Sequence, residues 1–131
     1  AVLIVRSVFN GEIYECTAAL GAVLGHNFPV YYKFSGGKGV STSFAVLCVL
    51  HYEVALIALA VFIITVLISR YVSLSSILAS AGAVIGAVIL YDFGVFFCFT
   101  LIIAVLCIIR HHANISRLLN GTENKLGKKK E

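Results

Sequence analysis

The polar residues that could bind an anion gather in three clusters, which long apolar runs separate. The first cluster is a turn that leads into an apolar segment and consists of Gly36, Gly37, Lys38 and Gly39. Glycines let backbone N–H groups face a ligand without a Cβ in the way, and a helix N-terminus adds a partial positive charge. The turn predicts a cradle for a phosphate or a carboxylate. The alternative is a flexible glycine turn with a solvated lysine.

The second cluster, residues 69–76, carries Ser73 and Ser76 where an apolar helix is expected to start. Serines at such a place can line a polar site or cap the helix. Arg70 in the same cluster can act as an anchor whose charge reaches the water at the membrane surface. The cluster adds hydroxyl groups that could contact the same anion.

The third cluster, residues 110–125, carries His111 and Asn114, which share one face if the segment is helical. Gly121 is expected to end that helix. The alternative is a juxtamembrane amphipathic helix that binds acidic headgroups. A histidine on a face with an asparagine is a candidate proton acceptor at neutral pH.

Metal and disulfide chemistry fit these residues poorly. The adjacent histidines 111 and 112 have no third ligand at a plausible spacing, so no metal and no cofactor are expected. The cysteines lie inside apolar runs without a C-x-x-C pair, which favours buried structural thiols over disulfides. They are Cys16, Cys48, Cys98 and Cys107.

The composition places these clusters in a membrane protein. Of the 131 residues 60% are hydrophobic and only 12% are charged, against roughly 45–50% and ~25% in soluble domains. Ten basic and six acidic residues cannot cover the surface of a soluble domain. Soluble globular and disordered classes are excluded, and the length suits one membrane domain over residues 1–131.

The elements expected to position the clusters are membrane helices. Three long uncharged runs and two weaker apolar segments predict about five membrane helices, and the chain opens with the end of a sixth. A short amphipathic C-terminal helix follows, so the fold class is an all-α polytopic transmembrane bundle. The segments are residues 1–5, 13–25, 40–52, 54–69, 71–90 and 93–109.

Charge and small residues predict the orientation and the packing. Basic residues lie in alternate connections and in the tail 110–131, which places these cytoplasmic if both weak segments cross. They are Lys33, Lys38, Arg70, Arg110, Arg117, Lys125 and Lys128–Lys130, while Glu12, Glu53 and Asp92 occupy the other connections, with Arg6 the one basic exception there. The motifs Gly21-x-x-x-Gly25 and Gly82-x-x-x-Gly86 predict close helix packing within the chain.

The three clusters together resemble a known family. They are similar to the bacterial acyl-phosphate-dependent glycerol-3-phosphate acyltransferases. The motifs that carry the resemblance are G-H-x-F-P followed by K-F-x-G-G-K-G-V at residues 25–40, the serine turn 70–76, and R-H-H-A-N-I at residues 110–115. The resemblance spans nearly the whole chain. It implies an inner-membrane enzyme with seven helices and a cytoplasmic active site, which makes lysophosphatidic acid and phosphate.

The resemblance also implies roles for single residues. The glycine turn, residues Gly36, Gly37, Lys38 and Gly39, would bind glycerol 3-phosphate, with Ser73 and Ser76 lining the pocket. His111 and Asn114 would be the catalytic pair, and His26, Pro29 and Glu123 would be structural. The implied partners are glycerol 3-phosphate, acyl phosphate and the bilayer, with no nucleic acid and no cofactor.

The front of the chain departs from the family. The family's first motif, G-S-G-N-x-G-A-T-N, is absent, which predicts that this is the C-terminal part of a larger enzyme, inactive alone. A small transporter and a membrane assembly subunit are the alternatives. If it is the enzyme, we expect direct transfer without an acyl-enzyme, an acyl groove open to the bilayer, and either His111 or a substrate phosphate as base.

Overall fold

The computed structural model describes residues 1–32 and 36–127, and in this part the chain is helical without a strand. The all-α prediction is confirmed, and the predicted segments match the observed helices within a few residues. The elements are α1 (Val2–Val8), α2 (Glu12–Asn27), the 3-10 turn η1 (Val30–Tyr32), α3 (Val40–Leu50), α4 (Tyr52–Ser69), α5 (Val72–Tyr91), α6 (Val95–Arg110) and α7 (His112–Leu119). Lys33 and Lys128–Lys130 lie outside the described residues.

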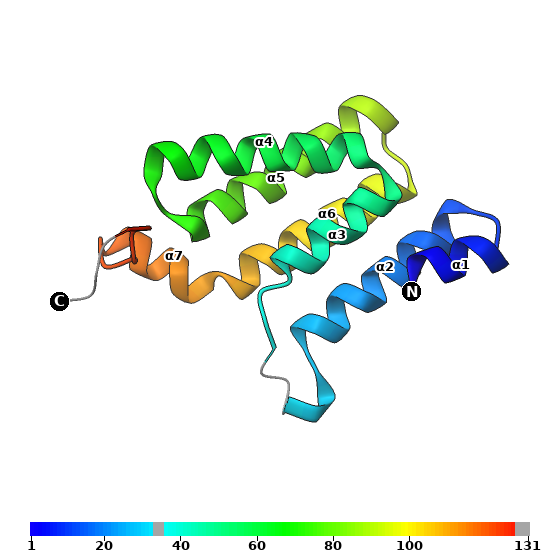
Figure 1. The fold of residues 1–131 in the computed structure, drawn as a ribbon, viewed down its shortest axis with the longest axis horizontal. Helices are drawn as coiled ribbons and strands as arrows, with labels where there is room; N and C mark the ends of the chain where they lie inside the picture. Colours follow the sequence, from blue (N-terminus) through cyan, green and yellow to red (C-terminus); the bar gives the residue numbers. More distant parts are fainter. Residues whose placement is uncertain (33–35, 128–131) are drawn as a thin grey trace.

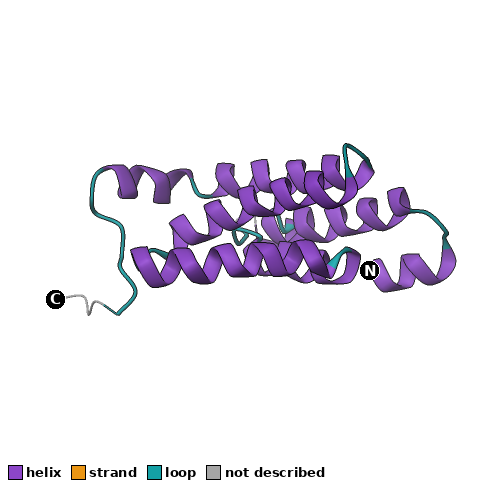
Figure 2. Ribbon diagram, turned by 90° about the horizontal axis from the view of Figure 1, so that it is seen from above, coloured by secondary structure: helices purple, strands orange, loops and turns teal. Residues whose placement is uncertain are grey.

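The helices form one elongated bundle. In Figure 1 the hairpin of α4 and α5 lies along one side, α1 and α2 lie along the other, and α3 and α6 run between them. The pairs α4–α5, α5–α6, α2–α6 and α3–α4 pack against each other. Seen from above in Figure 2, the helices run roughly lengthwise, with loops at both ends of the bundle and others near its middle.

Helix lengths set how much of a bilayer each element can cross. Helices α4 and α5, with 18 and 20 residues, are long and apolar enough to span, since ~1.5 Å per residue gives roughly 27 and 30 Å. Helices α6 and α7 qualify together as one segment bent by 58°. Helices α2 and α3 have 16 and 11 residues, so their crossing stays a prediction.

Small residues let α4 and α5 approach closely. A Cβ added at Gly82 would touch Val61, and one at Gly86 would come within 2.9 Å of Ile57. The predicted seam within the chain is confirmed here. For Gly21 and Gly25 the prediction is wrong: both face open space, because their side of α2 turns away from the rest of the described chain.

The thiols divide between the inside and the outside of the bundle. All four cysteines are free, and Cys16 and Cys107 are buried as expected. Cys48 and Cys98 are exposed, so the prediction of buried thiols is wrong for these two. A helix in lipid can turn a thiol outward without a solvation cost, since hydrocarbon is as apolar as the core.

The bundle has one end rich in acidic contacts and one end rich in basic contacts. At the first end Glu12 lies 3.3 Å from the His51 ring, and Tyr91 donates to Glu53 at 3.0 Å. At the second end Arg110 donates to the carbonyls of Gly36 and Gly37, and Arg117 donates to Glu123. The three predicted anion-binding clusters all lie at this second end, which is called the basic end below.

Because α3 is short, the glycine turn before it does not reach as far along the bundle as the end of α4. Helices α3 and α4 meet at His51, so Val40 and Phe62 lie at equal distances along the chain from that residue. Both line the same cavity. Because α4 continues to Ser69, the start of α3 lies about 10 Å short of the end of α4.

The α4–α5 seam predicts a clear mutational contrast. Gly86→Leu should lower the free energy of unfolding in detergent by about 1 to 3 kcal/mol, because the added side chain collides with Ile57. Gly21→Leu is the matched control and should change it by less than about 0.5 kcal/mol, since nothing faces that position. Equal effects of the two substitutions would contradict the assigned seam.

Candidate functional site

The glycine turn follows α2 and packs tightly on its last residues. A Cβ at Gly37 would collide with the His26 ring, and one at Gly36 would collide with Pro29 and with backbone carbonyls of α2. Gly36 therefore requires glycine whatever its dihedral angles, whereas a side chain at Gly37 would displace the His26 ring. His26 and Pro29, predicted to be structural, form the surface on which the turn rests.

The turn enters α3 through a left-handed residue. Gly39, the N-cap residue, has φ +74°, and no side chain caps the helix. The first N–H groups of α3 thus keep their donors available, as a helix N-terminus that binds an anion requires. Lys38 is exposed beside them, and the Asn27 side chain packs against Gly39, with no hydrogen-bond partner for its amide among residues 1–32 and 36–127.

A second turn, after α7, folds the tail back onto the bundle. Gly121 has φ +69°, and its N–H donates to the carbonyl of Leu118 at 3.2 Å. The N–H of Thr122 donates to the carbonyl of Arg117 at 2.8 Å. These two bonds form a Schellman motif, so the prediction that Gly121 ends the helix is confirmed. The reversal carries Glu123 back alongside α7.

The Glu123 carboxylate joins α5 to α7. Ser73 and the amide of Asn114 each donate to its Oε1 at 2.7 Å, and Arg117 donates to Oε2 at 2.7 Å. Burial by itself raises the pKa of Glu123, but these three donors outweigh burial and lower the pKa to about 2. The carboxylate is therefore ionised at neutral pH and holds Ser73 and Asn114 in fixed positions.

His111 is buried at the bend between α6 and α7, with 1% of its surface exposed. Its Nδ1 lies 2.7 Å from the carbonyl of Cys107 and must donate, because a carbonyl only accepts. Burial lowers the pKa of His111, and the positive charge of Lys38 lowers that pKa further. The neutral ring then carries a lone pair on Nε2, which makes no hydrogen bond to a described residue.

Ser76 lies about one helical turn after Ser73 on α5, and its side chain has different neighbours. Its hydroxyl donates to the carbonyl of Val72 at 2.9 Å, and its own carbonyl accepts from the Cys107 thiol at 4.0 Å. Both Ser76 and Cys107 line a cavity. The two predicted serines therefore have different partners in the structure: Ser73 donates to Glu123, whereas Ser76 lines the cavity.

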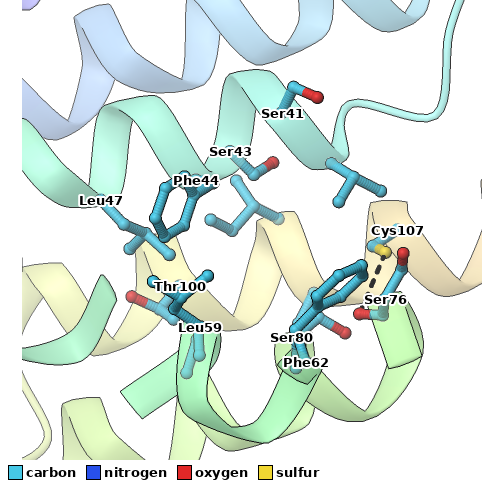
Figure 3. Close-up of a pocket in the computed structure, with 16 residues that line it drawn as sticks. Ser41, Ser43, Phe44, Leu47, Leu59, Phe62, Ser76, Ser80, Thr100 and Cys107 are labelled. Carbon is cyan, nitrogen blue, oxygen red and sulfur yellow. Dashed lines mark hydrogen bonds between the residues drawn. The ribbon is translucent and has the colours of Figure 1, made fainter. Parts of the chain in front are cut away.

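The cavity lies between α3, α4, α5 and α6 and has a volume of about 260 Å³. Apolar side chains make up most of its wall, with the hydroxyls of Ser41, Ser43, Ser76 and Ser80 among them. Figure 3 shows Phe44 and Leu47 of α3 facing Leu59 and Phe62 of α4 across it. An apolar chain fits such a space.

Arg110 is the residue at this end whose role the sequence did not reveal. Its guanidinium donates to the carbonyl of Gly36 at 2.6 Å and to that of Gly37 at 3.1 Å. It also lies over the Phe28 ring at 5.3 Å. Its position at the end of an apolar run predicts no partner in a segment 73 residues away.

The basic end therefore brings the predicted site residues together in two groups. The glycine turn, Lys38 and the start of α3 form one group, which Arg110 joins to α6. The other group is Ser73, Asn114 and Glu123. His111 lies between α6 and α7 and within electrostatic reach of both Lys38 and Glu123. Such an arrangement can hold an anion at one end of an apolar cavity.

Fold and site together define a polytopic helical membrane protein whose candidate anion site lies at the basic end. A family model described as glycerol-3-phosphate acyltransferase matches residues 1–121. The chain belongs to the glycerol-3-phosphate acyltransferase family, which confirms the resemblance seen in its motifs.

Relatives and solved structures agree with this assignment. Glycerol-3-phosphate acyltransferases of Thermoanaerobacter sp. (strain X514) and Halalkalibacterium halodurans are 43% and 44% identical, over 98% and 90% of this chain. A crystal structure of PlsY (YgiH), an integral membrane glycerol 3-phosphate acyltransferase in its glycerol 3-phosphate form, superposes with a TM-score of 0.89 at 35% identity over 96% of this chain. A lysophosphatidic acid form superposes equally well.

The chain is shorter than the proteins it matches. It spans 65% of the Thermoanaerobacter relative and 59% of the Halalkalibacterium relative. It covers 63% of the PlsY chain.

The Glu123 contacts predict a pH-dependent tail. Because the folded pKa lies below the usual 4.5, the stabilisation is present above pH 4.5 and is lost as the pH falls toward 2. Glu123→Gln removes the charge and should weaken the attachment of the tail at pH 7 by about 1 to 3 kcal/mol. Hydrogen exchange of residues 120–126 measures this effect.

Glu12→Gln, at the opposite end, is the control and should leave the tail unchanged. If Glu123→Gln exchanged no faster than the original chain at pH 7, the carboxylate would not hold the tail.

Proposed function

We propose that this chain carries the substrate-binding end of an acyltransferase that moves a fatty acyl group from acyl phosphate to glycerol 3-phosphate. One observation supports this most: the cavity wall formed by Ser76 and Cys107 lies one helical turn from His111, next to the anion-binding groups. A molecule with a phosphate head and an apolar tail can occupy both places at once. Acyl phosphate and lysophosphatidic acid both have that form.

In the proposed reaction the sn-1 hydroxyl oxygen attacks the acyl carbonyl carbon. A new C–O bond forms, the bond from the acyl carbon to the phosphate oxygen breaks, and inorganic phosphate leaves. The hydroxyl proton passes either to Nε2 of His111 or to a phosphate oxygen of the substrate. Phosphate is a good leaving group, so charge neutralisation by Lys38 and backbone N–H groups does much of the work.

The glycine turn binds the phosphate of glycerol 3-phosphate in this proposal. The N–H groups at the start of α3 and the ammonium of Lys38 supply donors and positive charge. The apolar cavity holds the acyl chain among α3, α4, α5 and α6. Asn114 and Ser73, fixed by Glu123, border the reacting groups.

The same charge pattern supports a location and an orientation. We propose that the protein lies in the bacterial inner membrane, with the basic end in the cytoplasm. An excess of basic residues favours the cytoplasmic side. The basic residues at that end are Lys38, Arg70, Arg110, Arg117 and Lys125. Glycerol 3-phosphate and acyl phosphate would then reach the site from the cytoplasm and the inner leaflet.

A transporter is less well supported. A transport path needs charged groups inside the membrane, and Glu15 was the one candidate in the apolar segments. Arg6 donates to Glu15 at 2.9 Å, so this carboxylate is already paired.

An acyl-transfer assay tests the proposal. Labelled glycerol 3-phosphate and palmitoyl phosphate are incubated with the chain alone and with the chain extended at its N-terminus by the first-motif segment of a relative. We expect labelled lysophosphatidic acid from the extended protein. Its absence from a folded, membrane-inserted extended protein would overturn the proposal.

His111→Gln and His112→Gln form a matched pair in that assay. His112 is exposed and its Nδ1 contacts only the carbonyl of Ile109 among the described residues. If Nε2 of His111 takes the proton, His111→Gln should lower kcat by about 10²- to 10⁴-fold and His112→Gln should not. A near-normal kcat for His111→Gln would assign the proton to the substrate phosphate.

Lys38→Ala and Lys125→Ala form the second pair. Lys125 lies over the Tyr71 ring at 5.4 Å, away from the glycine turn. Loss of a charged phosphate contact at Lys38 should raise the KM for glycerol 3-phosphate about tenfold or more, whereas Lys125→Ala should leave it unchanged. Equal KM values in the two variants would remove Lys38 from the phosphate site.

A further inference from the structure

Arg110 makes a contact that a membrane anchor does not need. Its Nη2 and Nε donate to two successive peptide carbonyls, those of Gly36 and Gly37. The guanidinium also stacks over Phe28, which immediately follows α2. One side chain from the end of α6 therefore fixes a turn that lies far away in the sequence.

The direction of those carbonyls determines the direction of the neighbouring N–H groups. In a trans peptide the C=O and the N–H of the same unit point in opposite directions. Because both carbonyls face Arg110, the N–H groups of Gly37 and Lys38 point away from the guanidinium. Neither N–H donates to any residue in the ranges 1–32 and 36–127.

Two successive N–H groups with no acceptor are an anion-binding arrangement. The opposite peptide orientation would present carbonyl oxygens in their place, and these repel a phosphate. Glycine makes both orientations accessible at residues 36 and 37, so the backbone alone does not select between them. A side chain with two donors in a fixed planar fork can select one.

We propose that Arg110 is a positioning residue that holds the glycine turn with its N–H groups presented to the phosphate of the substrate. This inference rests on the proposed function for the identity of that phosphate. Arg110 directly precedes His111 in the chain, so the same residue also keeps the phosphate site in register with the candidate base.

The test compares Arg110→Ala, Arg110→Lys and Arg6→Ala in the extended protein. Arg6 is the matched control, because it also donates to a backbone carbonyl, that of Val49, but at the opposite end of the bundle. Arg110→Ala should raise the KM for glycerol 3-phosphate about tenfold and change kcat by less than about threefold. Lysine keeps the positive charge but lacks the planar pair of donors, so Arg110→Lys should raise the KM less than Arg110→Ala does.

Two readouts do not depend on turnover. Calorimetric titration with glycerol 3-phosphate should show about tenfold weaker binding for Arg110→Ala. On addition of glycerol 3-phosphate, hydrogen exchange of the Gly37 and Lys38 amides should slow in Arg6→Ala and should slow less in Arg110→Ala. If Arg110→Ala does not fold, the same comparisons with Arg110→Lys decide, with a smaller expected loss of about threefold.

Unchanged binding and unchanged exchange in the Arg110 variants would overturn the positioning role. Failure of the proposed function has a different signature. In that case the unsubstituted protein forms no labelled lysophosphatidic acid, while the Arg110 variants still bind glycerol 3-phosphate more weakly and still show less protection of the turn by it.

Discussion

The structure depends on the inability of hydrocarbon to satisfy backbone hydrogen bonds. Within the bilayer the chain must be helical, so every irregular segment and nearly every charge moves to the ends of the bundle. The connections at one end carry Glu12, Glu53 and Asp92, and those at the other carry the candidate anion-binding groups. The glycine turn does not extend as far as the connection between α4 and α5, because the start of α3 lies about 10 Å short of the end of α4.

Irregular backbone so close to hydrocarbon needs side chains that fix it. Arg110 supplies donors to the glycine turn, and Glu123 accepts from groups on α5 and α7. Each contact joins segments that are distant in sequence, and each involves a charged group in partly dry surroundings, where hydrogen bonds are strong. The Arg110 contacts fix the glycine turn, and the Glu123 contacts fix α7. Both segments are therefore held in place next to the apolar cavity.

Much of the fold was predictable, since apolar runs and charge breaks mark membrane helices directly. The end of α7 at Gly121 was predictable because a Schellman turn needs glycine. The outward faces were not: lipid and core are equally apolar, so nothing in the sequence showed that Gly21 or Cys48 would face away from the bundle. The partners of Arg110 and Glu123 were also hidden, because both contacts depend on how distant helices pack.

The central claim is that the backbone of the glycine turn binds the substrate phosphate. Solid-state NMR in bilayers can measure the distance from the phosphorus of bound glycerol 3-phosphate to the amide nitrogens of Gly37 and Lys38 in the extended protein. If the turn binds the phosphate, we expect strong dipolar coupling to both nitrogens, as hydrogen-bonded contact requires. A phosphorus that couples to neither nitrogen, but does couple to the side chains of Arg70 or Lys125, would contradict it.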